Sequence, residues 1–279
     1  MVASVFDSSN QSIPLNSSYS FPFSSIVEFP ASPGVLIGLL APSLLPVVSN
    51  DWGKTWVAKK PIPNLGRTAK NTLPSSIVAA ANPTNNAAVF AWMDNMSYIY
   101  TTNTVDGKTW TYPEMIGFNP ITRYSDMDLV FNSMGTGVCV LSAAASGGDT
   151  DLASAMHQVS SANWNINNVL SYSASDSGDD KNIKLAAGGT GSGTQYLVVG
   201  VYESVSGQSG MGSVGNDGDI MAVISGNAGS TWNSNISFVN SWAKSDSASD
   251  RDPSICTNGS RFLATWTSNY SPTGSTSLN

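Results

Sequence analysis

The sequence predicts an all-β fold that is built from small four-stranded sheets. Short apolar runs of strand length recur along the whole chain, and Gly- or Asn-rich turns separate them. No segment shows the 3.6-residue periodicity of an amphipathic helix. A short turn that ends in tryptophan also returns at intervals. Repetition of this kind is typical of blades arranged radially in a β-propeller.

Each predicted blade begins with a strand-like run and continues through a turn into a second apolar run. The first runs are SSIVEF (24–29), SSIVAAA (75–81), MDLVFN (127–132), NIKLAAG (182–188) and DPSICTN (252–258). The second runs are GVLIGLLA (34–41), AAVFAWM (87–93), TGVCVLSAA (136–144), TQYLVVGVY (194–202) and SRFLATWTS (260–268). A third run then leads into the Trp-ended turn. We therefore expect blades at about 21–65, 72–116, 125–171 and 181–240.

The fifth blade is expected to draw its strands from both ends of the chain. Only two strand-like runs follow residue 252, whereas VASVF and IPLN near residue 1 are strand-like. Residues 252–279 and 1–16 would then share one blade, which closes the ring and leaves no exposed sheet edge. On this reading, residues 1–279 form a single five-bladed propeller. The alternative is that the sequence is a fragment of a longer propeller.

Composition excludes several classes of partner. Charged residues make up 11% of the chain, well below the ~25% of typical soluble domains, and the net charge is −7. No run of Lys or Arg is present, so we expect no nucleic-acid partner. The most apolar segment, 35–48, contains two prolines and is shorter than the ~20 residues of a spanning helix, so we expect no membrane insertion.

The location of the protein is predicted from its composition alone. Ser, Thr, Asn and Gly supply the polar surface, which favours an extracellular or surface-exposed location. No signal peptide is visible at the start, because neither a cationic segment nor an apolar one follows Met1. The oligomeric state stays open.

The recurring turn has a structural explanation. In SNDWGKTW (49–56), Asp51 can accept backbone N–H bonds, and Gly53 can adopt a positive φ at little cost. The hydroxyls of Ser49 and Thr55 can tie the two arms of the turn together. Trp56 is expected to pack its large ring between neighbouring sheets. Each copy is thus predicted to be a staple for one hairpin.

This turn resembles the Asp-box, or BNR repeat, of sialidase-like β-propellers. TVDGKTW (104–110) matches with one residue deleted, and SGNAGSTW (225–232) matches with Asn in the Asp place. The resemblance assigns structural Asp-box roles to Asp51, Gly53, Trp56, Asp106, Gly107, Trp110, Asn227, Gly229 and Trp232. As architecture the likeness covers nearly the whole chain, but Asp-boxes occur in lectin-like and receptor propellers as well as in glycosidases.

The resemblance also implies where a ligand would bind. In such propellers the Asp-box turns lie away from the ligand, and the loops that enter strand one lie on the ligand face. Sialidases use three arginines to hold the sugar carboxylate, and a guanidinium fork suits a carboxylate. The residues expected on this face as ligand-binding groups are Arg67, Arg123, Arg251, Tyr124 and Lys181.

Three functions follow as alternatives. The first is recognition of an acidic glycan or glycoprotein, or of another carboxylate ligand, without turnover. The second is exo-sialidase-like hydrolysis, for which the resemblance implies Tyr270 or Tyr202 as nucleophile, Glu203 as its base and Asp94 as the acid. The third is a purely structural or protein-interaction propeller, in which the arginines brace loops by pairing with nearby aspartates.

Other candidate groups are weaker. We expect no cofactor and no metal centre, although acidic turns at Asp176, Asp179 and Asp180, or at Asp217 and Asp219, contain the oxygen ligands that Ca²⁺ takes. His157 is the only histidine and has no nucleophile or metal partner near it in sequence. Cys139 and Cys256 lie in apolar runs and are expected to be reduced core thiols.

Overall fold

A computed structural model of the chain describes its strands and most of its turns. The described residues are 4–6, 12–14, 23–30, 32–41, 44–62, 76–94, 98–116, 123–144, 148–157, 164–169, 178–189, 195–205, 217–233, 237–239 and 247–269. These residues form strands and turns and contain no helix. Within the same ranges, no helix is therefore long and apolar enough to cross a membrane.

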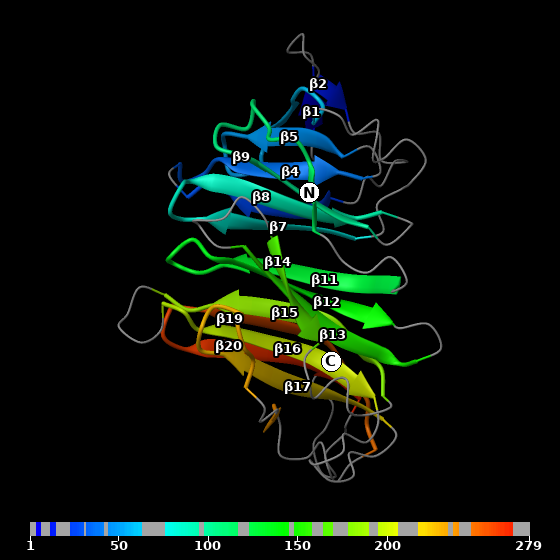
Figure 1. Cartoon of the computed structure of the whole chain (residues 1–279). Helices are drawn as coiled ribbons and strands as arrows, with labels where there is room; N and C mark the ends of the chain where they lie inside the picture. The colour runs from blue at the N-terminus through cyan, green and yellow to red at the C-terminus, as the bar shows by residue number, and fades with distance from the viewer. Residues whose placement is uncertain are drawn as a thin grey trace. The chain divides into compact units, whose positions relative to one another are not determined.

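The strands assemble into small sheets, which we number 1 to 5 along the chain (Figure 1). Sheet 1 has the spatial order β2 (Ser12–Pro14), β1 (Ser4–Phe6), β6 (Trp56–Ala58), β5 (Leu45–Ser49), β4 (Leu36–Leu40) and β3 (Phe23–Glu28). Sheet 2 has the order β10 (Glu114–Ile116), β9 (Ile99–Thr104), β8 (Ala87–Met93) and β7 (Ser76–Asn82). Sheet 3 contains β11 (Arg123–Phe131), β12 (Gly137–Ala144), β13 (Thr150–His157) and β14 (Trp164–Val169). Sheet 4 contains β15 (Asp180–Ala187), β16 (Val198–Val205), β17 (Gly218–Ser225) and β18 (Ser237–Phe238), and sheet 5 pairs β19 (Asp250–Thr257) with β20 (Phe262–Ser268).

The central strands β8 and β16 are buried along almost their whole length because both of their faces are covered. Every residue of β8, which reads AAVFAWM, is buried. The same holds for β16 up to its last residue, whereas the outer strand β10 buries only one of its three residues. This is the difference expected between a strand packed on both faces and one at the edge of its sheet. The all-β class is as the sequence predicts, and sheets 2, 3 and 4 each have the four strands expected.

Closure of a fifth blade by the two termini is not confirmed. Strand β1 pairs in parallel with β6 of sheet 1, with Val5 opposite Trp56, and β2 pairs with β1. Among the described residues, sheet 5 contains only β19 and β20. Strand β1 thus covers the outer edge of β6, whose backbone N–H and C=O groups would otherwise be left without a neighbouring strand.

The chain divides into two compact units. The first comprises Met1–Pro120, Leu129–Val138 and Ala155–Ile166, and the second comprises Ile121–Asp128, Cys139–Ser154 and Asn167–Asn279. Within the first unit, sheets 1 and 2 share one apolar core. Phe29, Ile37, Leu39 and Val48 of sheet 1 pack there with residues of sheet 2 that include Phe90 and Trp110.

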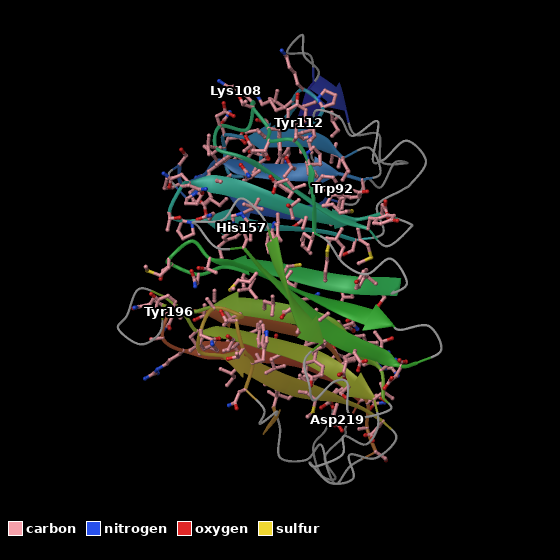
Figure 2. All side chains as sticks on the ribbon, in the orientation of Figure 1. Trp92, Lys108, Tyr112, His157, Tyr196 and Asp219 are labelled. Atoms are coloured by element: carbon pink, nitrogen blue, oxygen red, sulfur yellow. The ribbon has the colours of Figure 1, made fainter. Side chains whose placement is uncertain are left out.

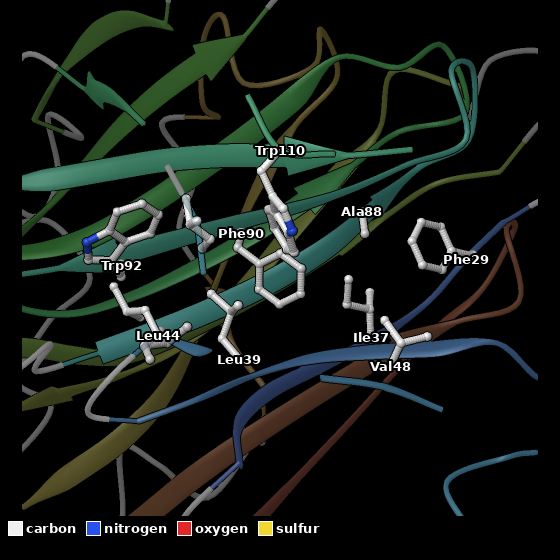
Figure 3. Packing of buried hydrophobic residues seen from close by; sticks show 11 residues of the cluster. Phe29, Ile37, Leu39, Leu44, Val48, Ala88, Phe90, Trp92 and Trp110 are labelled. Carbon is white, nitrogen blue, oxygen red and sulfur yellow. The ribbon is translucent and has the colours of Figure 1, made fainter. Parts of the chain in front are cut away.

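The rings of Phe90 and Trp110 form the centre of this core. Their centroids lie 5.7 Å apart at a tilt of 53° (Figure 3). Leu39 of β4 lies close to Phe90 in the same view. Tilted aromatic pairs of this kind add stabilisation beyond the area that they bury.

Tryptophan side chains join sheets 2, 3 and 4 to the sheet before each of them. Trp164 Nε1 donates to Thr101 Oγ1 on β9 over 3.1 Å, and Trp232 Nε1 donates to Ser154 Oγ on β13 over 3.2 Å. Trp110 enters the core shared with sheet 1. Trp56, in sheet 1, donates instead to Gly53 O in its own turn.

The two cysteines differ in environment. Cys139 is buried, and burial raises the pKa of its thiol. Cys256 on β19 is exposed, which corrects the expectation of two core thiols. The reason is the thin cover on sheet 5, where Leu263 of β20 is also 63% exposed.

Candidate functional site

The turn at Ser49–Trp56 is held by its own polar side chains. Asp51 Oδ1 accepts the Thr55 N–H at 2.8 Å, and Asp51 Oδ2 accepts the Thr55 hydroxyl at 2.7 Å. The Ser49 hydroxyl accepts the Gly53 N–H at 2.8 Å, and Gly53 has a φ of +81°. The hydrogen bonds from Thr55 lower the pKa of Asp51 to about 2.

The other two turns repeat this arrangement. Asp106 accepts the backbone N–H groups of Lys108 and Thr109 at 2.8 and 2.7 Å, and these bonds lower its pKa to about 2. In the third turn, Asn227 Oδ1 accepts the Thr231 N–H at 2.8 Å, and its amide donates to the Thr231 hydroxyl. Since these polar groups are used within the turns, the turns act as staples.

Several predicted ligand residues lie outside the described residues. Arg67 and Tyr270 belong to this group, and so does Asp176 of the acidic turns. Arg123 is the first residue of β11, but its side chain is outside the described part of the chain. Arg251 is exposed and lies within β19, not in a loop that enters it.

Glu203 on β16 is the centre of a polar cluster in the second unit. Its side chain is buried, at 4% exposure. Its Oε1 accepts two hydrogen bonds of 2.7 Å, one from Asn182 Nδ2 on β15 and one from the backbone N–H of Asp252 on β19. Its Oε2 lies 3.9 Å from Lys181 Nζ. One carboxylate thus ties together three strands from two sheets.

The two strands that contact Glu203, β15 of sheet 4 and β19 of sheet 5, each contain a bulge at the contact. The register of β15 shifts between Lys181 and Lys184, and that of β19 shifts between Arg251 and Ser254. Asn182 and Asp252 within these bulges have φ values of +55° and +53°. Positive φ is uncommon for residues other than glycine, and such strain is often found at functional sites.

Two exposed cations precede the bulged residues. Lys181 is 46% exposed at its side chain, and Arg251 is exposed as well. The structure therefore brings Lys181 next to Glu203, and on β19 the exposed Arg251 directly precedes Asp252, whose backbone N–H binds Glu203. We refer to these residues, with Asn182 and Asp252, as the Glu203 cluster.

The remaining predicted residues have structural partners. Asp94, in the first unit, is 5% exposed and accepts the Tyr98 N–H at 2.9 Å, which closes the β8–β9 connection. Tyr124 on β11 is buried at 8% exposure, and Tyr202 is fully buried. Burial, together with the charge of Asp94, raises the pKa of Tyr100.

No metal centre is found in the part of the chain that the structure describes. Within those residues, no group of three or more His, Cys, Asp or Glu side chains could hold a metal ion. Asp179 instead accepts the Thr150 N–H at 2.9 Å.

A cleft in the first unit was not foreseen from the sequence. It has a volume of about 320 Å³ and lies where residues of sheets 1 and 2 meet beside the β9–β10 turn. Its lining residues are Phe29, Ser32, Val35, Val48, Asn50, Lys59, Asn86, Val105, Asp106 and Lys108. Lys108 lies on the β9–β10 turn (Figure 2). No sequence pattern links these residues, because they come from five separate segments.

A second cavity in the same unit is much smaller, at about 50 Å³. Its lining includes His157, Trp164 and Glu114. The rings of His157 and Trp164 have centroids 5.3 Å apart. Burial lowers the pKa of His157, although the charge of Glu114 opposes this effect.

The comparisons with known proteins concern the fold. No protein-family model matches the sequence, and no curated protein matches it. Among solved structures, the chain is similar to the α-L-arabinanase of Penicillium chrysogenum in complex with arabinobiose, at 12% identity and a TM-score of 0.57. That match covers 86% of this chain and 73% of the arabinanase, and it supports a propeller-type fold.

Two further solved structures resemble the chain less well. One is the Aleuria aurantia lectin with α-methyl-L-fucoside, at 13% identity, a TM-score of 0.48, and coverage of 88% of this chain and 75% of the lectin. The other is a Hadza microbial sialidase, at 11% identity, a TM-score of 0.41 and coverage of 84% of this chain. The chain spans 63% of the length of that sialidase.

Proposed function

We propose that the protein recognises glycans without hydrolysing them, and that the Glu203 cluster is part of the site. The ligand class proposed for this site is a sugar that carries a carboxylate. The observation that carries the proposal is the pair of bulges at Asn182 and Asp252, which meet at the buried Glu203 carboxylate and are directly preceded in the chain by the exposed Lys181 and Arg251. A fold shared with an arabinanase does not by itself assign a function, so the proposal rests on these residues.

The two exposed cations of the cluster suit an anionic ligand. Glu203 is buried, whereas Lys181 and Arg251 are exposed and can meet a carboxylate from solvent, although the exposed carboxylate of Asp252 lowers the net positive charge there. The acidic remainder of the chain is largely screened, since the Debye length is about 8 Å at physiological ionic strength. Short-range contacts between the ligand carboxylate and Arg251 or Lys181 would then determine the preference of the site for an anion.

The carboxylates disfavour hydrolysis. A general base needs an oxygen that can reach the proton it removes. Glu203 already accepts bonds from Asn182 and Asp252, and Asp94 already accepts the Tyr98 N–H. Both carboxylates are also nearly inaccessible, at 4% and 5% exposure. Their hydrogen bonds therefore favour a supporting role over a catalytic one.

The test is a glycan array followed by titration of the best ligands with the variants Arg251→Ala and Lys181→Ala. We expect binding of sialylated or uronate sugars with micromolar to millimolar Kd, weakened at least fivefold by either variant and by added salt. Arg261→Ala is the matched control, because Arg261 is an exposed arginine on the β19–β20 turn. Equal affinity in all variants, or no binding on the array, would overturn the proposal.

The hydrolase alternative is tested on the same protein. Release of a fluorophore from a sialoside that disappears in Glu203→Gln would replace recognition with catalysis. We expect no release by the unmodified protein between pH 4 and pH 8, and Glu203→Gln to lower thermal stability instead.

A further inference from the structure

We propose that the cleft in the first unit is a second ligand site, distinct from the Glu203 cluster, and that it binds a small carboxylated sugar such as a uronate. Its volume of about 320 Å³ falls within the range of small-molecule sites, near the lower limit. The cleft therefore fits one or two sugar rings rather than a long chain.

Hydrogen-bond donors dominate the polar rim of the cleft. Lys59 and Lys108 carry ammonium groups, and Asn50 and Asn86 carry amides that can donate. The carboxylate of Asp106 also lines the cleft, but it accepts the N–H groups of Lys108 and Thr109 within its own turn. The groups left for a ligand thus favour an anion that carries hydroxyls.

The floor and one edge of the cleft are apolar. Phe29 and Val48 are buried beneath it, whereas Val105 is 59% exposed at its edge. A sugar ring presents hydroxyls on its rim and C–H groups on its faces, so a mixed lining of this kind matches both. An inorganic anion would use the lysines but would leave Val105 uncovered.

The β9–β10 turn packs closely against sheet 1. Gly107 has a φ of +66°, and a methyl group at this position would come within 3.0 Å of Val48 and 3.7 Å of Phe29. This close approach places Val105, Asp106 and Lys108 over the residues of sheet 1. The site is therefore largely formed before a ligand arrives, which lowers the entropic cost of binding.

The distribution of charge supports an anionic ligand here. The first unit contains six Lys or Arg and six Asp or Glu, whereas the second contains six and thirteen. The whole net charge of −7 therefore belongs to the second unit. A ligand anion meets no net repulsion from the first unit.

The experiment is an NMR titration of the full chain with D-galacturonate, with D-galactose and acetate as separate arms. We expect saturable amide shifts at Asn50, Val105 and Lys108 with galacturonate, and at least fivefold weaker binding with either galactose or acetate. Galactose tests the carboxylate, and acetate tests the sugar ring. Equal shifts with galactose, or with acetate, would overturn the assignment to a carboxylated sugar.

Variants then locate the site. Lys59→Gln and Lys108→Gln keep most of each side chain but remove its charge, and we expect each to weaken galacturonate binding at least fivefold. Lys54→Gln is the matched control, because Lys54 is exposed on the neighbouring turn and does not line the cleft. Arg251→Ala should leave these shifts unchanged, so this site and the Glu203 cluster can fail independently. Unchanged affinity in both lysine variants would overturn the proposal.

Discussion

At the scale of single residues, the Trp-ended turns are stabilised by hydrogen bonds between residues that are near neighbours in sequence. Asp51 and Asp106 are bound by groups within four residues of them. Because every partner lies so close in sequence, the roles of these residues could be predicted from the sequence. The partners of the tryptophans could not, since Thr101 and Ser154 lie 63 and 78 residues away from Trp164 and Trp232.

The position of Thr101 and Ser154 in their strands also explains why Trp110 lacks an equivalent hydrogen bond. Thr101 and Ser154 each lie three residues before the end of the third strand of their sheet, at Thr104 and His157. The corresponding residue in β5 is Pro46, which has no hydroxyl. Trp110 Nε1 is accordingly buried without a hydrogen-bond partner among the described residues. The ring of Trp110 is held by the apolar core instead.

The turns predict a pH dependence of stability. Asp51 and Asp106 have a pKa of about 2 in the folded chain, against an ordinary value of 3.8. A lowered pKa means that their contribution is complete above about pH 4 and is lost as the pH falls towards 2. The double variant Asp51→Asn, Asp106→Asn should show a smaller fall in Tm over this interval, with little change at pH 7.

The third turn provides the control for this experiment. Asn227 makes equivalent bonds without a charge, so Asn227→Asp should increase the fall in Tm between pH 4 and pH 2. Tm is measured against pH for the unmodified protein, the double variant and Asn227→Asp, which tests both the predicted decrease and the predicted increase in acid sensitivity. Identical acid profiles would show that the carboxylates do not contribute to stability in this way.

At the scale of elements, glycines set how closely sheets 4 and 5 approach. The Gly189 N–H donates to Gly259 O over 2.8 Å, which joins the segment after β15 to the β19–β20 turn. A methyl group on Gly189 would lie 2.7 Å from Gly259 Cα, and backbone cannot move aside as a flexible side chain can. This contact depends on the absence of a side chain at Gly189.

The contact predicts a destabilising substitution. Gly189→Ala should lower the free energy of unfolding by about 1–3 kcal/mol, the usual cost of overpacking. Gly226→Ala is the matched control, because nothing lies within 4 Å of a methyl group there, and its effect should stay within about 0.5 kcal/mol. Urea denaturation measures both, and equal midpoints for the two variants would contradict the prediction.

At the scale of the whole molecule, the place of the N-terminal strands decides how the sheets are completed. The pairing of β1 with β6 extends sheet 1, whereas the sequence predicted that this strand completes the last blade. Apolar alternation predicts that a segment is a strand, but it does not say which sheet edge accepts it, because the backbone groups of all edges are alike.

A truncation distinguishes these two arrangements. Removal of residues 1–16 should increase hydrogen exchange of the β6 amides and promote aggregation, since the edge of sheet 1 is then exposed. Exchange in β20 should stay unchanged. Increased exchange at residues 262–268 with unchanged exchange at 56–58 would instead support closure through a shared fifth blade.

The sequence by itself determined the all-β class, most of the strand positions along the chain and the polar bonds of the turns, because these depend on contacts between near neighbours. Only the tertiary structure decided that Glu203 is a buried support, since its partners Asn182 and Asp252 lie 21 and 49 residues away. The cleft between sheets 1 and 2 was likewise decided by packing. A concave surface is a property of how sheets meet, and residues from five separate segments carry no shared pattern along the chain.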